Sequence, residues 1–193
     1  MIEQAGPHCP IDTGRIDLGA LSAITYGLYV VTSHDGERKN GALVNTVVQV
    51  AGQPCQVSVS VNKASLTHEL IMTSGVFAVS VLEQDTPLEF IGRFGFRTGR
   101  NYDKFSKTRF HDGATGCPLL DEHTLAHVEA RVRTAVDCGS HTTFIADVVA
   151  SAKVKPGAPL TYEYYHKVKG GKTGKGAPTY GMDMSKCDKG VKA

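Results

Sequence analysis

Strand-forming segments dominate this chain and constrain its fold more than any other feature. Six segments are rich in β-branched and aromatic residues, as is typical of β-strands: 23–33, 39–50, 57–61, 76–82, 125–136 and 141–151. In the third segment valines alternate with serines, so Val57, Val59 and Val61 are expected to face the core. The chain shows no strand–helix–strand alternation and no GxGxxG motif, which argues against a doubly wound dinucleotide-binding fold.

Two short helices are predicted between the strands. Residues 65–74 have apolar side chains at helical spacing, and Gly75 follows as a stop. The second helix is expected to begin at Thr86 as the N-cap, with Leu88 and Ile91 on a shared face. Many strands with few helices suggest a closed antiparallel barrel, and hence a mainly β fold with a few short peripheral helices.

The charge distribution separates a body from a tail. The 193 residues have a formal net charge of +2, but residues 167–193 contain seven lysines and two aspartates, a local charge of +5 that leaves −3 for the rest. We therefore expect one domain over 1–166 and a basic, Gly/Lys-rich tail over 167–193. The tail is too poor in apolar residues to order itself alone, so it is either disordered or draped over another surface, such as a partner subunit.

Several absent features narrow the possible partners and compartment. A net charge near zero gives no argument for binding nucleic acid. No apolar run is long enough to span a membrane, and the first residues do not read as a secretory signal. The five cysteines form no CxxC pair, so neither a disulfide framework nor a metal site is expected, and reduced thiols in a cytoplasm are the simplest interpretation.

Two polar segments carry groups suited to an anion. The run VNKASLTHEL (61–70) leaves a strand and opens a helix, where unpaired N–H groups, the Ser65 and Thr67 hydroxyls and the Lys63 charge suit a phosphate. The alternative is a helix cap beside a solvated lysine. In FRTGRNYDKF (96–105), Arg100 and Lys104 follow a glycine and would complete a phosphate clamp; the alternative is an exposed charged turn.

Two further segments carry groups suited to a heterocyclic ring. Asparagine is disfavoured within strands, so Asn45, followed by Thr46 and Val47, indicates a site for a hydrogen-bonding ring edge; the alternative is a β-bulge or a turn residue. His141 follows a Gly-Ser turn and suits positioning a nicotinamide or proton transfer; the alternative is a surface histidine. His127 is interpreted as structural. Together, the four segments point to bound flavin mononucleotide (FMN).

These motifs, in this order and spacing, resemble a known family. From Leu21 to about Ser151 the chain is similar to flavin reductase-like proteins of the FMN-binding split-barrel class, on the matching pieces TYGLYVVTS, NGALVNTVVQV, NKASLTHELIMTSGVFAVSVL, GRNYDKF, AHVEARV and GSHTTFIADVV. Within the class it resembles the flavoredoxin and NAD(P)H:flavin oxidoreductase branch, to which the later piece KGGKTGKGAPTY is also similar. Ser140 departs from the pattern, because an acid usually precedes the histidine.

The resemblance implies a fold, an assembly and a set of site residues. It implies a six-stranded antiparallel split β-barrel that forms a homodimer, with FMN in a groove near the subunit interface. The isoalloxazine would be lined by Asn45, Thr46 and Val47. The phosphate would be held by Lys63, Ser65 and Thr67, aided by Arg100 and Lys104. His141 would lie close to the nicotinamide site.

The implied activity is an oxidoreductase that passes electrons from NADH or NADPH through the flavin to free flavin, a ferric complex or a redox protein. The flavin carries the chemistry, so the protein supplies binding, orientation and electrostatics. One alternative is an FMN electron carrier that does not use a nicotinamide, with an acidic redox protein docking on lysines of segment 167–175. Another is a related split barrel acting on pyridoxamine phosphate or haem.

Overall fold

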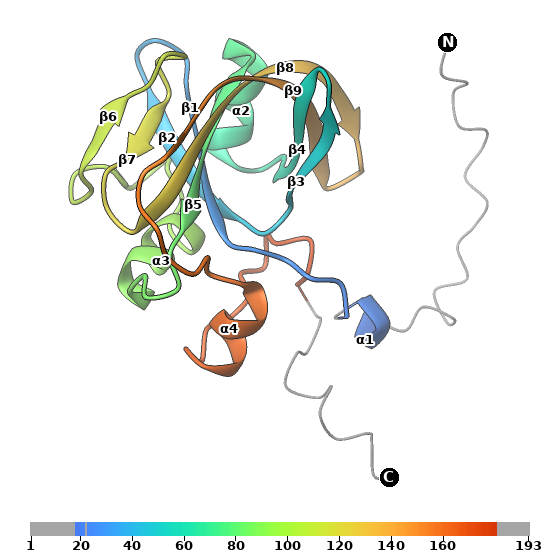
Figure 1. Ribbon diagram of the computed structural model, residues 1–193, viewed down its shortest axis with the longest axis vertical. Coiled ribbons are helices and arrows are strands. Elements are labelled where there is room, and N and C mark those ends of the chain that lie inside the picture. The colour runs from blue at the N-terminus through green and yellow to red at the C-terminus, as the bar shows by residue number, and fades with distance from the viewer. Residues whose placement is uncertain (1–17, 22, 181–193) are drawn as a thin grey trace, which may run out of the picture.

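The computed structural model describes residues 18–21 and 23–180, which build a mainly β domain (Figure 1). Its strands are β1 (Tyr29–His34), β2 (Lys39–Val44), β3 (Val47–Gly52), β4 (Cys55–Asn62), β5 (Val76–Leu82), β6 (Phe110–Asp112), β7 (Pro118–Leu120), β8 (Thr124–Asp137) and β9 (His141–Lys153). Its helices are α1 (Leu18–Leu21), α2 (Leu66–Ser74), α3 (Leu88–Gly95) and α4 (Tyr162–Lys167). The predicted fold class is confirmed.

Seven strands form one antiparallel sheet in the order β2-β1-β5-β8-β9-β4-β3. The expected single strand over 39–50 is two strands, because the chain leaves β2 at one edge of the sheet and crosses at Asn45 and Thr46 to start β3 at the other edge. The expectation of a closed barrel is wrong: among the described residues no ladder of hydrogen bonds pairs β2 with β3, and the sheet is open. The chain itself, rather than strand pairing, links the two edges.

The long strands β8 and β9 arch over the molecule and carry much of its curvature (Figure 1). Their pairing shifts register between Glu129 and Ala130 and again between Val132 and Thr134. Such irregularities bend a strand and increase its twist, which lets one hairpin pair with β5 on one side and with β4 on the other. The separate β6–β7 pair was not predicted from the sequence.

Two clusters of buried apolar side chains hold the layers together. One lies inside the curved sheet and includes Val57, Val59 and Val61, which confirms the predicted alternation in β4. Phe77 and Phe144 are its largest members and are almost fully buried. The other cluster joins α3 and α4 to the sheet at β1 and β5. The described helices include none that is both long and apolar enough to cross a membrane.

The two helices flanking β5 agree to different degrees with the boundaries predicted from the sequence. Helix α2 begins after Ser65, whose side chain accepts the Thr67 N–H, and ends at Gly75 in the left-handed conformation, as predicted. Helix α3 begins one residue later than expected, with Pro87 in the N-cap position and no side-chain cap. Leu88 and Ile91 lie three residues apart in α3, but they are buried unequally, since Leu88 is 47% exposed while Ile91 is fully buried.

Gly75 allows a test of how much the end of α2 depends on backbone freedom. Its φ is +69°, and an added Cβ would meet no atom within 4 Å, so only the backbone opposes a side chain there. We expect Gly75→Ala to lower the free energy of unfolding by about 1–2 kcal/mol, the cost of the left-handed region for an L-residue. Urea denaturation followed by circular dichroism measures it. Gly52→Ala is the matched control, because an added Cβ at Gly52 also meets nothing but its φ lies outside the left-handed range. Equal losses for both variants would contradict this account.

Candidate active site

A cavity of about 300 Å³ opens where β2, the start of α2 and the end of α3 approach one another. The segment that follows α4 forms another wall of this cavity, although it is distant in sequence from β2. Four of the sequence-predicted site residues line it: Asn45, Ser65, Lys104 and His141. They come from four separate parts of the chain, so the fold brings together groups that the sequence only suggested as a set.

Asn45 lies at the crossing between β2 and β3 and has an unused hydrogen-bonding atom. Its side chain is 6% exposed, and its Nδ2 donates to Thr179 Oγ1 at 3.0 Å. Its Oδ1 is buried and has no hydrogen-bond partner among the described residues. Leaving a buried amide oxygen unpaired costs about 1–3 kcal/mol, so this atom requires an explanation, and a ligand that donates an N–H to it would supply one.

His141, the first residue of β9, lines the cavity in a defined tautomer. Its Nε2 lies 3.1 Å from the carbonyl oxygen of Gly176, which only accepts, so Nε2 carries the hydrogen. Its Nδ1 then accepts from the Ser140 hydroxyl at 2.8 Å. Burial lowers the pKa of His141, and the bond to Gly176 partly opposes this. The ring is therefore neutral near pH 7 and presents a polar edge to the cavity.

Lys104 is a buried cation in the cavity wall. It is 4% exposed, and its ammonium donates to the carbonyl oxygens of Gly41 at 2.7 Å and Phe94 at 3.2 Å. Desolvation by burial lowers the pKa of Lys104 to about 8. An ammonium has three hydrogens, so one remains for an acceptor in the cavity.

Ser65 places the N-terminus of α2 at the cavity, and Ala64 and Leu66 line it on either side. Helix N-termini expose unpaired N–H groups and the positive end of the helix dipole. Ser65 is already engaged as the N-cap, where its oxygen accepts the Thr67 N–H at 3.1 Å.

The other predicted residues lie outside the cavity lining. Lys63 is paired with Asp137, and Arg100 with Glu69. Thr67 is fully buried beneath the site and accepts a hydrogen bond from Asn40 at 2.9 Å. Thr46 donates to the Ser60 carbonyl at 3.2 Å, and Val47 packs against the core inside the sheet.

Residues 172–178 form a wall of the cavity that sequence reasoning missed. The Gly176 carbonyl accepts from both His141 and Asn62 Nδ2, and Thr179 accepts from Asn45. This part of the expected tail is therefore draped over its own chain, while residues 181–193 lie outside the described part. A signal was present in Gly171: an added Cβ there would lie 2.2 Å from the Tyr165 ring, so the segment can approach α4 closely only with glycine.

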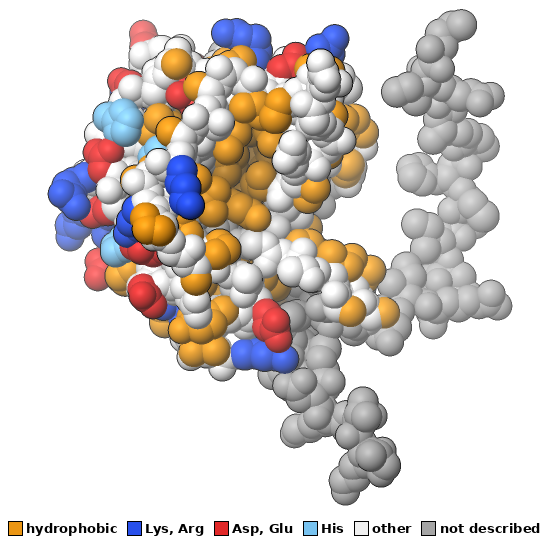
Figure 2. Space-filling view, viewed as in Figure 1, with side chains coloured by type: hydrophobic (Ala, Val, Ile, Leu, Met, Phe, Trp, Pro, Cys, Tyr) orange, Lys and Arg blue, Asp and Glu red, His pale blue; other side chains and the backbone are white. Residues whose placement is uncertain are grey.

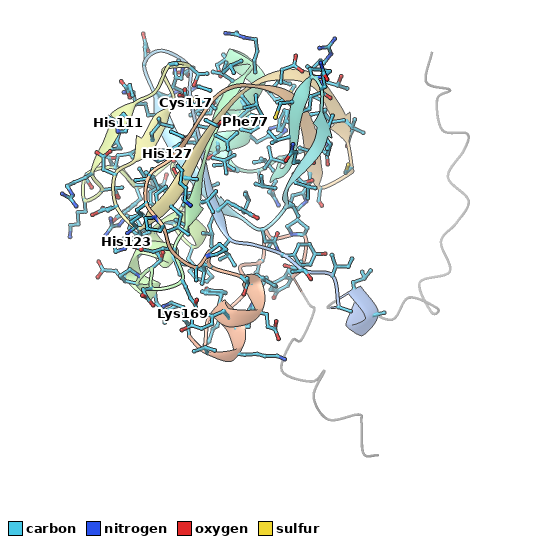
Figure 3. The ribbon with its side chains drawn as sticks, viewed as in Figure 1. Phe77, His111, Cys117, His123, His127 and Lys169 are labelled. Carbon is cyan, nitrogen blue, oxygen red and sulfur yellow. The ribbon has the colours of Figure 1, made fainter. Side chains whose placement is uncertain are left out.

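Other histidines and cysteines lie elsewhere. His111 and His127 lie on the side of the molecule formed by β6 and β7 (Figure 3), and His127 is buried beside Ser80, in agreement with its structural interpretation. Cys55, Cys117 and Cys138 are free thiols, and Cys9 and Cys187 lie outside the described residues. Within residues 18–21 and 23–180, no group of three His, Cys, Asp or Glu side chains is arranged to hold a metal ion.

Comparison with known proteins assigns the family. A model of flavin reductase like domains matches residues 21–170, and the chain belongs to this family. It is 44% identical over 171 residues to a high molecular weight rubredoxin of Moorella thermoacetica, covering 89% of this chain and 75% of that protein. It is also 44% identical over 165 residues to a ferric-chelate reductase (NAD(P)H) of Archaeoglobus fulgidus, covering 86% and 98%. Among solved structures, an NADH:FAD oxidoreductase of Streptomyces globisporus matches with a TM-score of 0.65 at 25% identity, over 78% and 89% of the two chains.

Proposed function

We propose that this protein is an NAD(P)H-dependent flavin oxidoreductase that binds FMN in the cavity beside Asn45. The observation that carries the proposal is the buried, unpaired Oδ1 of Asn45, a residue that lines the cavity together with a buried cation and a neutral histidine. A flavin ring has one imide N–H between two carbonyls, and that edge matches an amide acceptor. A volume of about 300 Å³ is at the small end of ligand sites, which favours FMN over a dinucleotide.

The residues fit the two ends of such a cofactor. Asn45 would accept from the ring, with Thr46 and Val47 fixing the crossing behind it. The N-terminus of α2 at Ser65 suits the phosphate, and Lys104 supplies the buried positive charge. The remaining members of the proposed phosphate site are Lys63, Thr67 and Arg100. They lie outside the cavity lining and would have to exchange their present bonds to Asp137, Asn40 and Glu69 to contact the phosphate.

When bound, the flavin would supply hydride acceptance from the nicotinamide and onward electron transfer. The residues of this chain would bind the flavin and the nicotinamide and orient them. The His141 Nε2–H lies at the cavity, where it would donate to the carboxamide oxygen of a nicotinamide. To do so it must exchange its bond to the Gly176 carbonyl. No proton transfer by His141 is needed for this positioning, which agrees with a ring kept neutral by burial.

We further propose that the protein works as a cytoplasmic homodimer and delivers electrons to a redox protein or a ferric complex. Figure 2 shows apolar side chains gathered in a hollow between the β8–β9 arch and the β3–β4 hairpin. Partly buried apolar residues packed against the core inside the sheet include Tyr29, Val44, Val128 and Val148. Open apolar areas of this kind are typical of subunit interfaces. A monomeric mass in sedimentation equilibrium would contradict the homodimer.

Anaerobic mixing of the FMN-loaded protein with NADH or NADPH tests the activity. We expect bleaching of the flavin absorbance by at least one of the two. We also expect His141→Ala to slow the bleaching more than it weakens FMN retention, because His141 positions the nicotinamide. Fast reduction by dithionite with no reduction by either nicotinamide would instead support the electron carrier. The similarity to a high molecular weight rubredoxin is the observation that favours the electron carrier as a second candidate function.

Lys104 gives the FMN affinity a defined pH dependence. The pKa of Lys104 is about 8, so the ammonium is charged below pH 8 and attracts the anionic cofactor, and it loses its charge above that pH. We expect the Kd for FMN to rise above pH 8, by at most about tenfold per pH unit for one titrating group. Fluorescence titration from pH 7 to 9.5 measures this.

Two variants test whether titration of Lys104, rather than of another group, causes the rise in the Kd for FMN above pH 8. Lys104→Arg keeps its charge at every pH tested and should show no rise in Kd over this range. Lys104→Met should bind more weakly at pH 7 and also lose the dependence. If all three proteins show the same pH profile, Lys104 does not interact with the cofactor.

A further inference from the structure

A continuous chain of hydrogen bonds connects the cavity to His166 at the end of α4. Asn45 Nδ2 donates to Thr179 Oγ1 at 3.0 Å, and Thr179 lies 2.8 Å from the Tyr162 hydroxyl. Tyr162 is bonded in turn to Thr173 Oγ1, and Thr173 lies 3.2 Å from His166 Nε2. Asn45, Tyr162 and Thr179 are all buried, so these groups have no competing water.

One direction of this chain gives every hydroxyl hydrogen an acceptor. An amide nitrogen only donates, and each hydroxyl carries one hydrogen and can accept. In that direction Thr179 accepts from Asn45 and donates to Tyr162, Tyr162 donates to Thr173, and Thr173 donates to Nε2 of a neutral His166. Asn45 therefore keeps its nitrogen toward Thr179, and its Oδ1 is the atom left without a partner.

Protonation of His166 favours the opposite direction for the chain. A charged imidazole donates from Nε2, and Thr173 accepts there. Every hydroxyl hydrogen then has an acceptor if Thr173 donates to Tyr162, Tyr162 to Thr179, and Thr179 to the Oδ1 of Asn45. In that arrangement the Asn45 amide is turned over, which leaves Nδ2 as the group available to a ligand.

We propose that His166, acting through Thr173, Tyr162 and Thr179, determines which end of the Asn45 amide meets the ligand, and that Tyr162 and Thr179 are specificity-determining positioning residues. With His166 neutral, the cavity selects a heterocycle that presents an N–H donor, such as the imide of a flavin. With His166 charged, this selectivity falls. The inference rests on the proposed flavin site and adds that the site recognises the imide N–H of the ring.

The surroundings of His166 are consistent with a neutral ring near pH 7. The rings of Tyr162 and Tyr165 lie 4.4 and 5.1 Å from its centroid, and the polar groups facing it from the following segment are Thr173 and the Gly171 backbone. Burial lowers the pKa of His166, while the Gly171 backbone raises it, and no charged group of the described residues contributes to the shift. Acidification from pH 7.5 should therefore reverse the chain progressively, with a midpoint below the usual pKa of histidine.

The test compares the Kd values of FMN and of its N3-methyl analogue, which cannot donate from that position. We expect wild-type protein at pH 7.5 to prefer FMN about tenfold, the order expected when a buried acceptor is left unpaired. The preference should fall progressively as the pH is lowered from 7.5, in line with titration of one histidine whose pKa is lowered by burial. Because both ligands have the same phosphate, its titration and any effect of Lys104 cancel in the ratio.

Matched variants decide whether the chain carries this effect. Tyr162→Phe and Thr179→Val break it and should give a smaller, pH-independent preference, whereas Thr179→Ser keeps a hydroxyl and should behave as wild type. Tyr165→Phe removes a hydroxyl of the same helix that bonds Lys172 rather than the chain, and should keep the pH dependence. If Tyr162→Phe fails to fold, the Thr179 pair gives the same comparison.

The outcomes separate the inference from the proposed function. Wild-type protein that binds neither flavin overturns the proposed site itself. Binding of FMN with a preference that is independent of pH, or one that Thr179→Val leaves unchanged, overturns the inference while the flavin site stands. Loss of the pH dependence in Thr179→Val and its return in Thr179→Ser supports the chain.

Discussion

The architecture depends on how an antiparallel sheet with two free edges is closed. Here the chain itself passes from edge strand β2 to edge strand β3 at Asn45 and Thr46. The polar groups of residues at such a crossing lie outside the regular hydrogen bonding between strands, so these groups are available for other hydrogen bonds. Thr46 fastens the crossing to β4 through the Ser60 carbonyl, and Asn45 bonds Thr179 and lines the cavity. The site is a consequence of the way the sheet is joined.

The predictions from sequence that hold are those whose causes are local. The alternation of valine and serine correctly predicts that Val57, Val59 and Val61 lie in the core, and Gly75 correctly predicts the end of α2. Both effects depend only on residues close together in the sequence. An asparagine within a strand-like run marked a real irregularity, which is the break between β2 and β3. The closed barrel was wrong because edge pairing depends on strands far apart in the chain.

The cavity could be predicted only in part for the same reason. Lys63 was expected in a phosphate clamp, but Asp137, 74 residues later, pairs with it outside the cavity lining. Lys104 was expected as an exposed or clamping cation and is buried against two carbonyl groups. The composition of residues 172–178 indicates only that they cannot form a core, and Gly171 is the one local signal that this segment can approach α4 closely.

The Ser140–His141 pair shows how a small departure from a family pattern changes electrostatics. An acid before the histidine would favour the charged imidazole, whereas the Ser140 hydroxyl donates one neutral bond to Nδ1. With the Gly176 carbonyl on Nε2, both ring nitrogens are satisfied without a charge. The ring is thus neutral, with its Nε2–H held by the Gly176 carbonyl at the wall of the cavity.

The wall formed by residues 172–178 has a consequence for the order of events during synthesis. A ribosome makes β2, α2 and β9 before it makes this segment, so the sheet can take shape while the pocket still lacks one side. Gly176 and Thr179 then bond side chains that emerged earlier, at Asn62, His141 and Asn45. Loading of any small molecule that needs this wall must therefore wait until translation has passed Thr179.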